Sequence, residues 1–100
     1  MKKDIFNKYV DNVATIFEIT RDDFFSKSKK REFVEARHLV WYLCFNRPMT
    51  IIYIQRFMES YGYKISHSPV IYGINSVTQK VMSDEDYIDI VNKVDKNVKL

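Results

Sequence analysis

The sequence predicts an all-α fold, a small bundle of about six helices that forms a single domain over residues 1–100. Three observations lead to this prediction. Apolar residues recur every three or four positions along nearly the whole chain, which is the spacing of amphipathic helices. Only two glycines and two prolines occur, too few for a turn-rich sandwich or barrel. The chain is 46% hydrophobic, enough for one modest core.

The N-terminal third of the chain predicts two helices and a basic loop. The apolar stripe of the first helix consists of Ile5, Tyr9, Val13, Ile16 and Phe17. Thr20 and Asp23 are spaced as in a capping box, so a short second helix containing Phe24 and Phe25 is expected to follow. The polar and basic segment SKSKKRE, residues 26–32, is expected to be a loop.

A third helix is predicted from Phe33 to Arg47. Its apolar residues cover much of its circumference, which is typical of a helix at the centre of a small bundle. We expect it to end before Pro48, because proline disfavours helical geometry in the residue that precedes it.

The fourth and fifth helices are expected to form a helix-turn-helix over approximately residues 50–81. Thr50 can cap the fourth helix. The run IIYI is β-branched and compatible with a strand, but the helical spacing continues beyond it and favours a helix. Gly62 suits a left-handed turn, and Ser66 is expected to cap the fifth helix with Pro69 in its first turn.

A sixth helix is expected near the C-terminus. Ser83 and Asp86 are spaced as its capping pair, and acidic residues crowd its first turn, where the helix dipole favours them. Tyr87, Val91 and Val94 lie on its apolar side, and Val98 would continue this stripe.

The charge pattern allows an anionic partner. The net charge is +3 and the isoelectric point is about 9.0. Residues 20–80 carry ten lysines and arginines against five acidic residues. The densest part of this region consists of Lys27, Lys29, Lys30 and Arg31. Such a run can form a nucleic-acid patch, and it can equally be a solvated loop.

The sequence argues against an enzyme. Cys44, the single cysteine, and His38 lie six positions apart in the most apolar predicted helix, where such residues usually belong to the core. One cysteine and two histidines show no metal-ligand spacing, so neither a metal nor a cofactor is expected. No apolar run is long enough to span a membrane, and no signal peptide follows Met1. We therefore expect a cytoplasmic protein without a membrane partner.

The predicted fifth helix has the features of a DNA recognition helix, whose N-terminal residues read bases in the major groove. Its outward stripe consists of Ser68, Tyr72, Asn75 and Gln79. None of these side chains is acidic, as a surface that faces phosphates requires. Ser66, His67 and Ser68 add short polar groups to the first turn, where free backbone N–H groups favour an anion. The simpler interpretations are that Ser66 only caps the helix and that His67 is an exposed histidine without a binding role.

The segment SHSPVIYGI resembles the signature Asp-His-Thr-Thr-Val-Leu-His-Ala of the C-terminal DNA-binding domain of the bacterial replication initiator DnaA, a Trp-repressor-like helix-turn-helix. Ser66 stands at the aspartate of the signature, His67 at its histidine, and Ser68 and Pro69 at its two threonines. Residues 13–37 are similar to the stretch of this family that contains its Ser-Lys basic loop. The resemblance covers roughly residues 9–81.

This resemblance implies sequence-specific binding of double-stranded DNA in replication or transcription control. It implies that His67 and Ser68 contact the major groove with Ser66 beside them. The residues implied for the loop contact are Lys27, Lys29, Lys30 and Arg31. Arg31 is the residue expected in the minor groove, and Arg37 is expected to reach a phosphate.

Departures from the family pattern limit what is carried over. Ser66 and Pro69 replace an aspartate and a threonine, so the preferred DNA sequence can differ. The chain contains no glycine-rich phosphate loop, so we expect a stand-alone DNA-binding protein that binds no nucleotide, with a replication or transcription protein as a further partner. The alternative is a protein-interaction module that keeps the fold without binding DNA. Its docking face would consist of Tyr53, Tyr61, Tyr63 and Tyr72.

Overall fold

The computed structural model describes residues 1–98, and this part of the chain consists of six α-helices without a strand. The helices are α1 (Lys2–Phe17), α2 (Arg21–Phe24), α3 (Arg31–Phe45), α4 (Ile51–Ser60), α5 (His67–Ser83) and α6 (Glu85–Asn97). The predicted all-α fold is confirmed. The run IIYI opens α4, as its helical spacing predicted.

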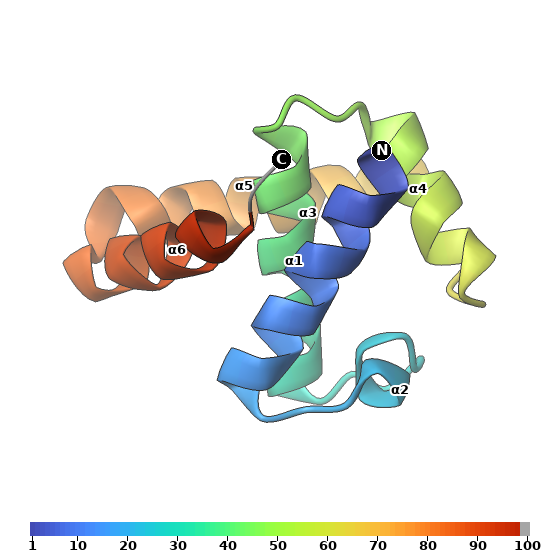
Figure 1. Ribbon diagram of the computed structural model, residues 1–100, viewed down its shortest axis with the longest axis horizontal. Coiled ribbons are helices and arrows are strands. Elements are labelled where there is room, and N and C mark those ends of the chain that lie inside the picture. The colour runs from blue at the N-terminus through green and yellow to red at the C-terminus, as the bar shows by residue number, and fades with distance from the viewer. Residues whose placement is uncertain (99–100) are drawn as a thin grey trace.

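The third helix is the centre of the bundle. α3 contacts each of the other five helices, and its most extensive contacts are with α5 and α1. Figure 1 shows α1 crossing in front of α3 and α5 passing behind it, while α6 lies beside the second half of α5. α4 packs against the first half of α5 on the other side of α3, so α4 and α5 form the two helices of the expected motif.

The core forms where the apolar stripes of these helices meet. Its fully buried members include Phe6, Val13, Leu39, Ile54 and Val77, which come from α1, α3, α4 and α5. Burying such a side chain stabilises the fold by about 1.5–3 kcal/mol. Cys44 is also fully buried, and burial raises the pKa of its thiol. None of the helices described combines the length and hydropathy needed to cross a membrane.

Three of the expected helix ends are confirmed. The hydroxyl of Thr20 accepts a hydrogen bond from the N–H of Asp23, whose carboxylate accepts the N–H of Thr20 in return, which completes the capping box. Thr50 accepts from the N–H of Tyr53 at the start of α4. Gly62 has φ +87°, in the left-handed region that glycine tolerates and other residues rarely adopt.

Two helix starts differ from the prediction. α3 begins at Arg31 rather than Phe33 and ends at Phe45 rather than Arg47, so Arg31 is helical. The predicted Ser83–Asp86 cap of the last helix is wrong, because Ser83 is the final residue of α5. Asp84 caps α6 instead, with its carboxylate accepting the N–H of Asp86 at 2.9 Å. A carboxylate at this position also interacts favourably with the helix dipole.

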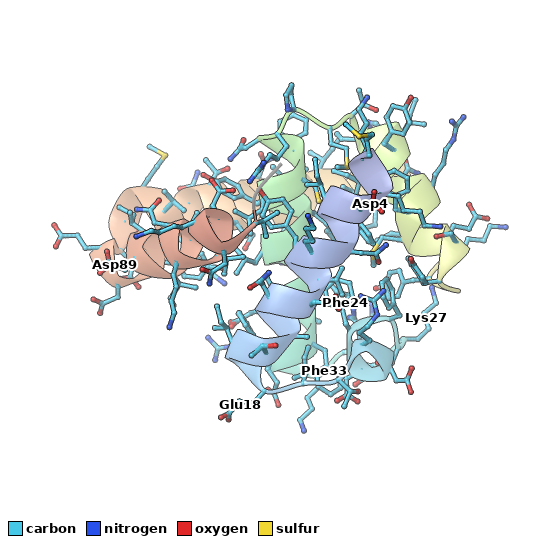
Figure 2. All side chains as sticks on the ribbon, viewed as in Figure 1. Asp4, Glu18, Phe24, Lys27, Phe33 and Asp89 are labelled. Atoms are coloured by element: carbon cyan, nitrogen blue, oxygen red, sulfur yellow. The ribbon has the colours of Figure 1, made fainter. Side chains whose placement is uncertain are left out.

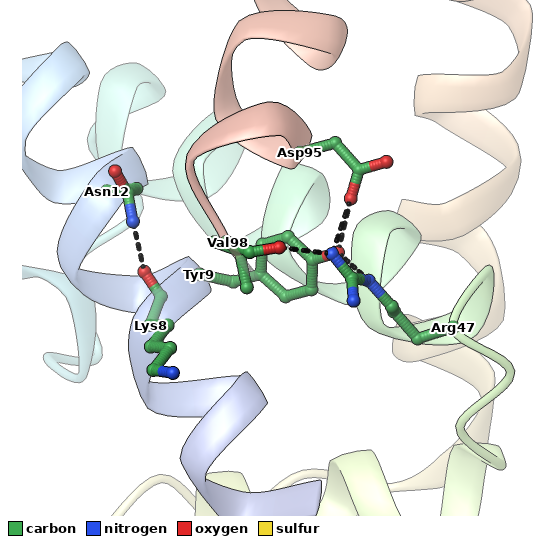
Figure 3. A network of polar contacts seen from close by, with 6 residues as sticks. All are labelled: Lys8, Tyr9, Asn12, Arg47, Asp95 and Val98. Atoms are coloured by element: carbon green, nitrogen blue, oxygen red, sulfur yellow. Dashed lines mark hydrogen bonds and ion pairs between the residues drawn. The ribbon is translucent and has the colours of Figure 1, made fainter. Parts of the chain in front are cut away.

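A polar network fastens the C-terminal helix to the bundle (Figure 3). The buried hydroxyl of Tyr9 on α1 donates to the carboxylate of Asp95 on α6 and accepts from Nε of Arg47, in the turn after α3. The Nη2 group of Arg47 donates to Asp95 at 3.2 Å and to the carbonyl of Val98 at 2.6 Å. Burial, followed by the bond to Asp95, raises the pKa of Tyr9.

Candidate nucleic-acid interface

The basic loop between α2 and α3 is organised by Arg37, which is only 2% exposed. Its Nε donates to the carbonyl of Phe24 at 2.7 Å, and Nη1 donates to the carbonyl of Ser28 at 3.1 Å. Nη2 donates to the carbonyl of Ser26. Arg37 therefore differs from what the resemblance implied, because its guanidinium is turned inward and holds the loop backbone instead of lying on the surface.

The loop is joined to the turn before α5 through Tyr63. The ring of Tyr63 contacts two cations, with Nζ of Lys27 4.1 Å and the guanidinium of Arg37 4.9 Å from its centroid. Lys27 also donates to the carbonyl of Lys64 at 2.8 Å. Figure 2 shows Lys27 between the α2 loop and the end of α4. We call Lys27, Tyr63 and Arg37 the tyrosine clamp.

The clamp brings the two expected DNA-contacting segments together. Cation–π pairs of this kind contribute about 0.5–1 kcal/mol when exposed and more when desolvated. Gln55 of α4 adds a further link by donating to the carbonyl of Ile65 at 3.1 Å. Burial lowers the pKa of Arg37, and Tyr63 opposes this shift. An arginine nevertheless stays charged in proteins, so the cation–π contact with Tyr63 is kept.

The other basic residues of the loop face solvent. Lys29 and Lys30 are exposed, and Lys30 pairs with Glu32 at 3.4 Å. The side chain of Arg31 is 88% exposed and pairs with Glu35, one helical turn further along α3, at 3.1 Å. Lys27, Lys29 and Ser66 line one hollow of about 350 Å³, which connects the loop to the start of α5.

The first turn of α5 is open to solvent. Ser66, His67 and Ser68 are all exposed. Ser66 is the N-cap residue of α5, as predicted, and is extended, but its hydroxyl accepts no capping hydrogen bond. The exposed position of the three side chains is compatible with the expected groove contact, which stays a prediction.

The outward face of α5 continues beyond its first turn. Tyr72 is 70% exposed, and its ring meets His38 of α3 edge to face, with ring centroids 6.0 Å apart. Asn75 and Gln79 are exposed on the same helix. Tyr72 borders a hollow of about 370 Å³ on one side, which Tyr63, Trp41 and Lys29 also line.

Three residues on or beside this face of α5, namely His38, Lys80 and Glu35, were not among the DNA-binding residues predicted from the sequence. His38 is half-buried, and burial lowers its pKa to about 4, with Lys80 and Arg37 adding to the effect and Glu35 opposing it. His38 is therefore neutral at neutral pH. Lys80 lies two turns after Tyr72, and Glu35 lies one turn after Arg31. Helical spacing alone would have found both.

The tyrosines proposed for a protein-docking face lie in different places. Tyr53 of α4 and Tyr61, just after α4, meet the N-terminal lysines of α1, with Lys2 4.4 Å and Lys3 5.0 Å from the respective ring centroids. Tyr63 belongs to the clamp, and Tyr72 lies on α5 against His38. The four tyrosines therefore contact different parts of the protein and do not form one docking face together.

The structure bears on the metal and thiol chemistry considered from the sequence. Over residues 1–98, no group of three or more histidine, cysteine or acidic side chains could hold a metal ion. Cys44 is fully buried with a raised pKa, which disfavours the thiolate that a nucleophile requires.

Comparison with known proteins finds similarity over the part of the chain that contains the basic loop and α4. A family model described as the bacterial DnaA protein helix-turn-helix matches residues 7–77. The chain is also similar to the chromosomal replication initiator protein DnaA of Corynebacterium jeikeium (strain K411), with 26% identity over 90 residues. This similarity covers 90% of the chain but only 15% of the relative. The residues matched by the family model include the basic loop, α4 and the part of α5 up to Val77.

Proposed function

The chain belongs to the bacterial DnaA helix-turn-helix family, and we propose that it binds double-stranded DNA in a sequence-specific manner. In the proposed complex, α5 enters the major groove and the basic loop reaches the adjacent minor groove. In helix-turn-helix proteins, the second helix reads base edges with its N-terminal residues.

The tyrosine clamp is the observation that carries this proposal. It holds the basic loop beside the turn that leads into α5, because Lys27 and Arg37 both contact the ring of Tyr63. A cationic loop and a helix start with exposed polar side chains are therefore presented together. Contact with two grooves of one duplex requires such a constant spacing.

We assign the roles by position. His67 and Ser68 contact base edges, with Ser66 beside them, and Tyr72 and Asn75 extend the contact along α5. Lys29 and Lys30 contact the DNA from the loop, and Arg31, at the start of α3, contacts the minor groove. Lys27 contributes positive charge as a member of the clamp, and Arg37 acts by holding the loop in shape.

The proposed process is replication or transcription control. The printed name of the relative describes a chromosomal replication initiator, but the chain spans only about 15% of that protein's length. The proposal is therefore limited to DNA binding and, as a further partner, a protein of replication or transcription.

Selection from a pool of random duplex DNA at two salt concentrations tests the proposal. We expect one enriched motif and an affinity that falls steeply as salt rises, because lysine and arginine contacts release counterions from the DNA. His67→Ala should relax the motif at the positions it reads, at a cost of about 1–3 kcal/mol, while Arg31→Ala should weaken binding.

Lys93→Ala is the matched control for Arg31→Ala, since it removes one positive charge from the exposed surface of α6. A loss of affinity equal to that of Arg31→Ala would mean that only net charge matters. Absence of binding at low salt would overturn the proposed function.

A further inference from the structure

Glu35 lies between two cations that come from different helices. Its Oε1 is 3.1 Å from Nε of Arg31 on α3 and 3.7 Å from Nζ of Lys80 on α5. The three side chains line a hollow of about 340 Å³ between these helices, together with Lys29 and Tyr72.

The composition of this hollow is that of an anion site. The described residues that line it include three basic side chains and one acidic side chain, and Ser76 and Tyr72 add hydroxyl donors. His38 contributes no charge at neutral pH, because burial lowers its pKa to about 4. The carboxylate of Glu35 is the anion that occupies the site in the free protein.

We propose that this hollow binds one backbone phosphate of the duplex, and that Glu35 holds the place of that phosphate until DNA arrives. The inference rests on the proposed DNA binding and adds Lys80 and Glu35 to it. Carboxylate and phosphate present similar acceptor oxygens to arginine and lysine, so one can replace the other on the same donors.

The exchange is feasible because the ion pairs are weak. The side chain of Arg31 is 88% exposed, and Lys80 and Glu35 are about one third exposed. Exposed pairs of this kind contribute little to stability, since solvent screens them and the side chains lose freedom. Arg31 can therefore leave Glu35 when DNA arrives, but the remaining carboxylate repels the phosphate. Glu35 thereby lowers the affinity for DNA of any sequence.

Glu35→Gln tests the inference, with Asp89→Asn as the matched control. Both variants remove one negative charge, but Asp89 is exposed on α6, remote from the basic loop (Figure 2). Duplex affinity would be measured by fluorescence anisotropy at several salt concentrations. We expect Glu35→Gln to bind about three- to ten-fold more tightly, because the phosphate then meets the same cations without a carboxylate beside them. Asp89→Asn should change the affinity by less than about two-fold.

Lys80→Ala identifies the donor. In the double variant with Glu35→Gln, the gain in affinity should shrink, because the phosphate then loses one of its cations. Thermal melting of each variant would verify the fold, and Glu35→Ala, which keeps helix propensity, provides a second substitution.

The outcomes separate the two proposals. If the wild type binds DNA and Glu35→Gln behaves like Asp89→Asn or binds more weakly, the phosphate site is refuted and the proposed function stands. In the weaker case, Glu35 would act by positioning Arg31. If the wild type binds no duplex at low salt, both proposals fail.

Discussion

Gly73 of α5 lies directly against His38 of α3. A Cβ atom at position 73 would be 2.6 Å from Cδ2 of His38 and 2.8 Å from Cε3 of Trp41, closer than such atoms approach in proteins. The close approach of α3 and the proposed recognition helix α5 therefore depends on the absence of a side chain at residue 73.

Gly73→Ala should destabilise the protein by about 1–3 kcal/mol, since an added methyl group must push aside two ring systems in a packed core. Urea denaturation would measure the change, with Gln79→Ala on the exposed side of α5 as a control within about 0.5 kcal/mol of the wild type. An increase in stability of about 1 kcal/mol, as helix propensity alone predicts, would contradict this packing.

Arg37→Lys should lose most of the hydrogen bonds that hold the basic loop, although it keeps the positive charge. A lysine cannot bond the carbonyls of Phe24, Ser26 and Ser28 together as the guanidinium does. We expect a loss of about 2–3 kcal/mol of stability, because partly buried carbonyls are left without donors. Denaturation and DNA binding would be measured together. Unchanged stability with weaker binding would instead indicate a direct phosphate contact.

His38 should make stability depend on pH. Its pKa is about 4 in the fold, owing first to burial and then to Lys80 and Arg37, against 6.5 for a free histidine. The unfolded chain therefore binds the proton first, and the stability that is present above about pH 6.5 is lost as pH falls towards 4.

Between pH 7 and pH 5 we expect His38 to lower the free energy of unfolding by about 1 kcal/mol. This value is reduced to account for the partial exposure of the ring. Thermal melts across this range would show a smaller decline in His38→Gln, which cannot titrate. Parallel declines in both proteins would assign the effect to other groups.

Tyr9→Phe should loosen α6. The substitution removes the hydroxyl that links Arg47 and Asp95, and the expected cost is about 1–2 kcal/mol. Hydrogen exchange should accelerate in α6 more than in α4, where this network makes no contact. Asp89→Asn on the same helix is the control, and equal exchange in both variants would argue against the network as the anchor.

Local patterns in the sequence predicted much of this structure. The capping box at Thr20 and the left-handed turn at Gly62 depend on residues a few positions apart, so they could be recognised from the sequence. Helical spacing also predicted α4 correctly as a helix, although its β-branched residues are compatible with a strand. Asp84 was missed as a cap because Ser83, one residue earlier, has the spacing of a capping box with Asp86.

Arg37 and the Tyr9 network show what such patterns could not supply. An arginine near a basic run resembles a surface cation, and its inward direction depends on loop carbonyls that only the folded chain provides. Arg37 is nonetheless spaced three and four positions before the buried residues Val40 and Trp41, which indicates the same face of α3. Tyr9 and Asp95 are 86 positions apart, and no local rule relates them.

The tyrosine clamp also affects the thermodynamics of association. A loop that becomes ordered only on DNA would add a large unfavourable conformational entropy and a strongly negative heat-capacity change to binding. Here Lys27, Tyr63 and Arg37 order the loop during folding. Calorimetry should therefore show a heat-capacity change that corresponds to the docked surface alone, as in the association of two preformed bodies.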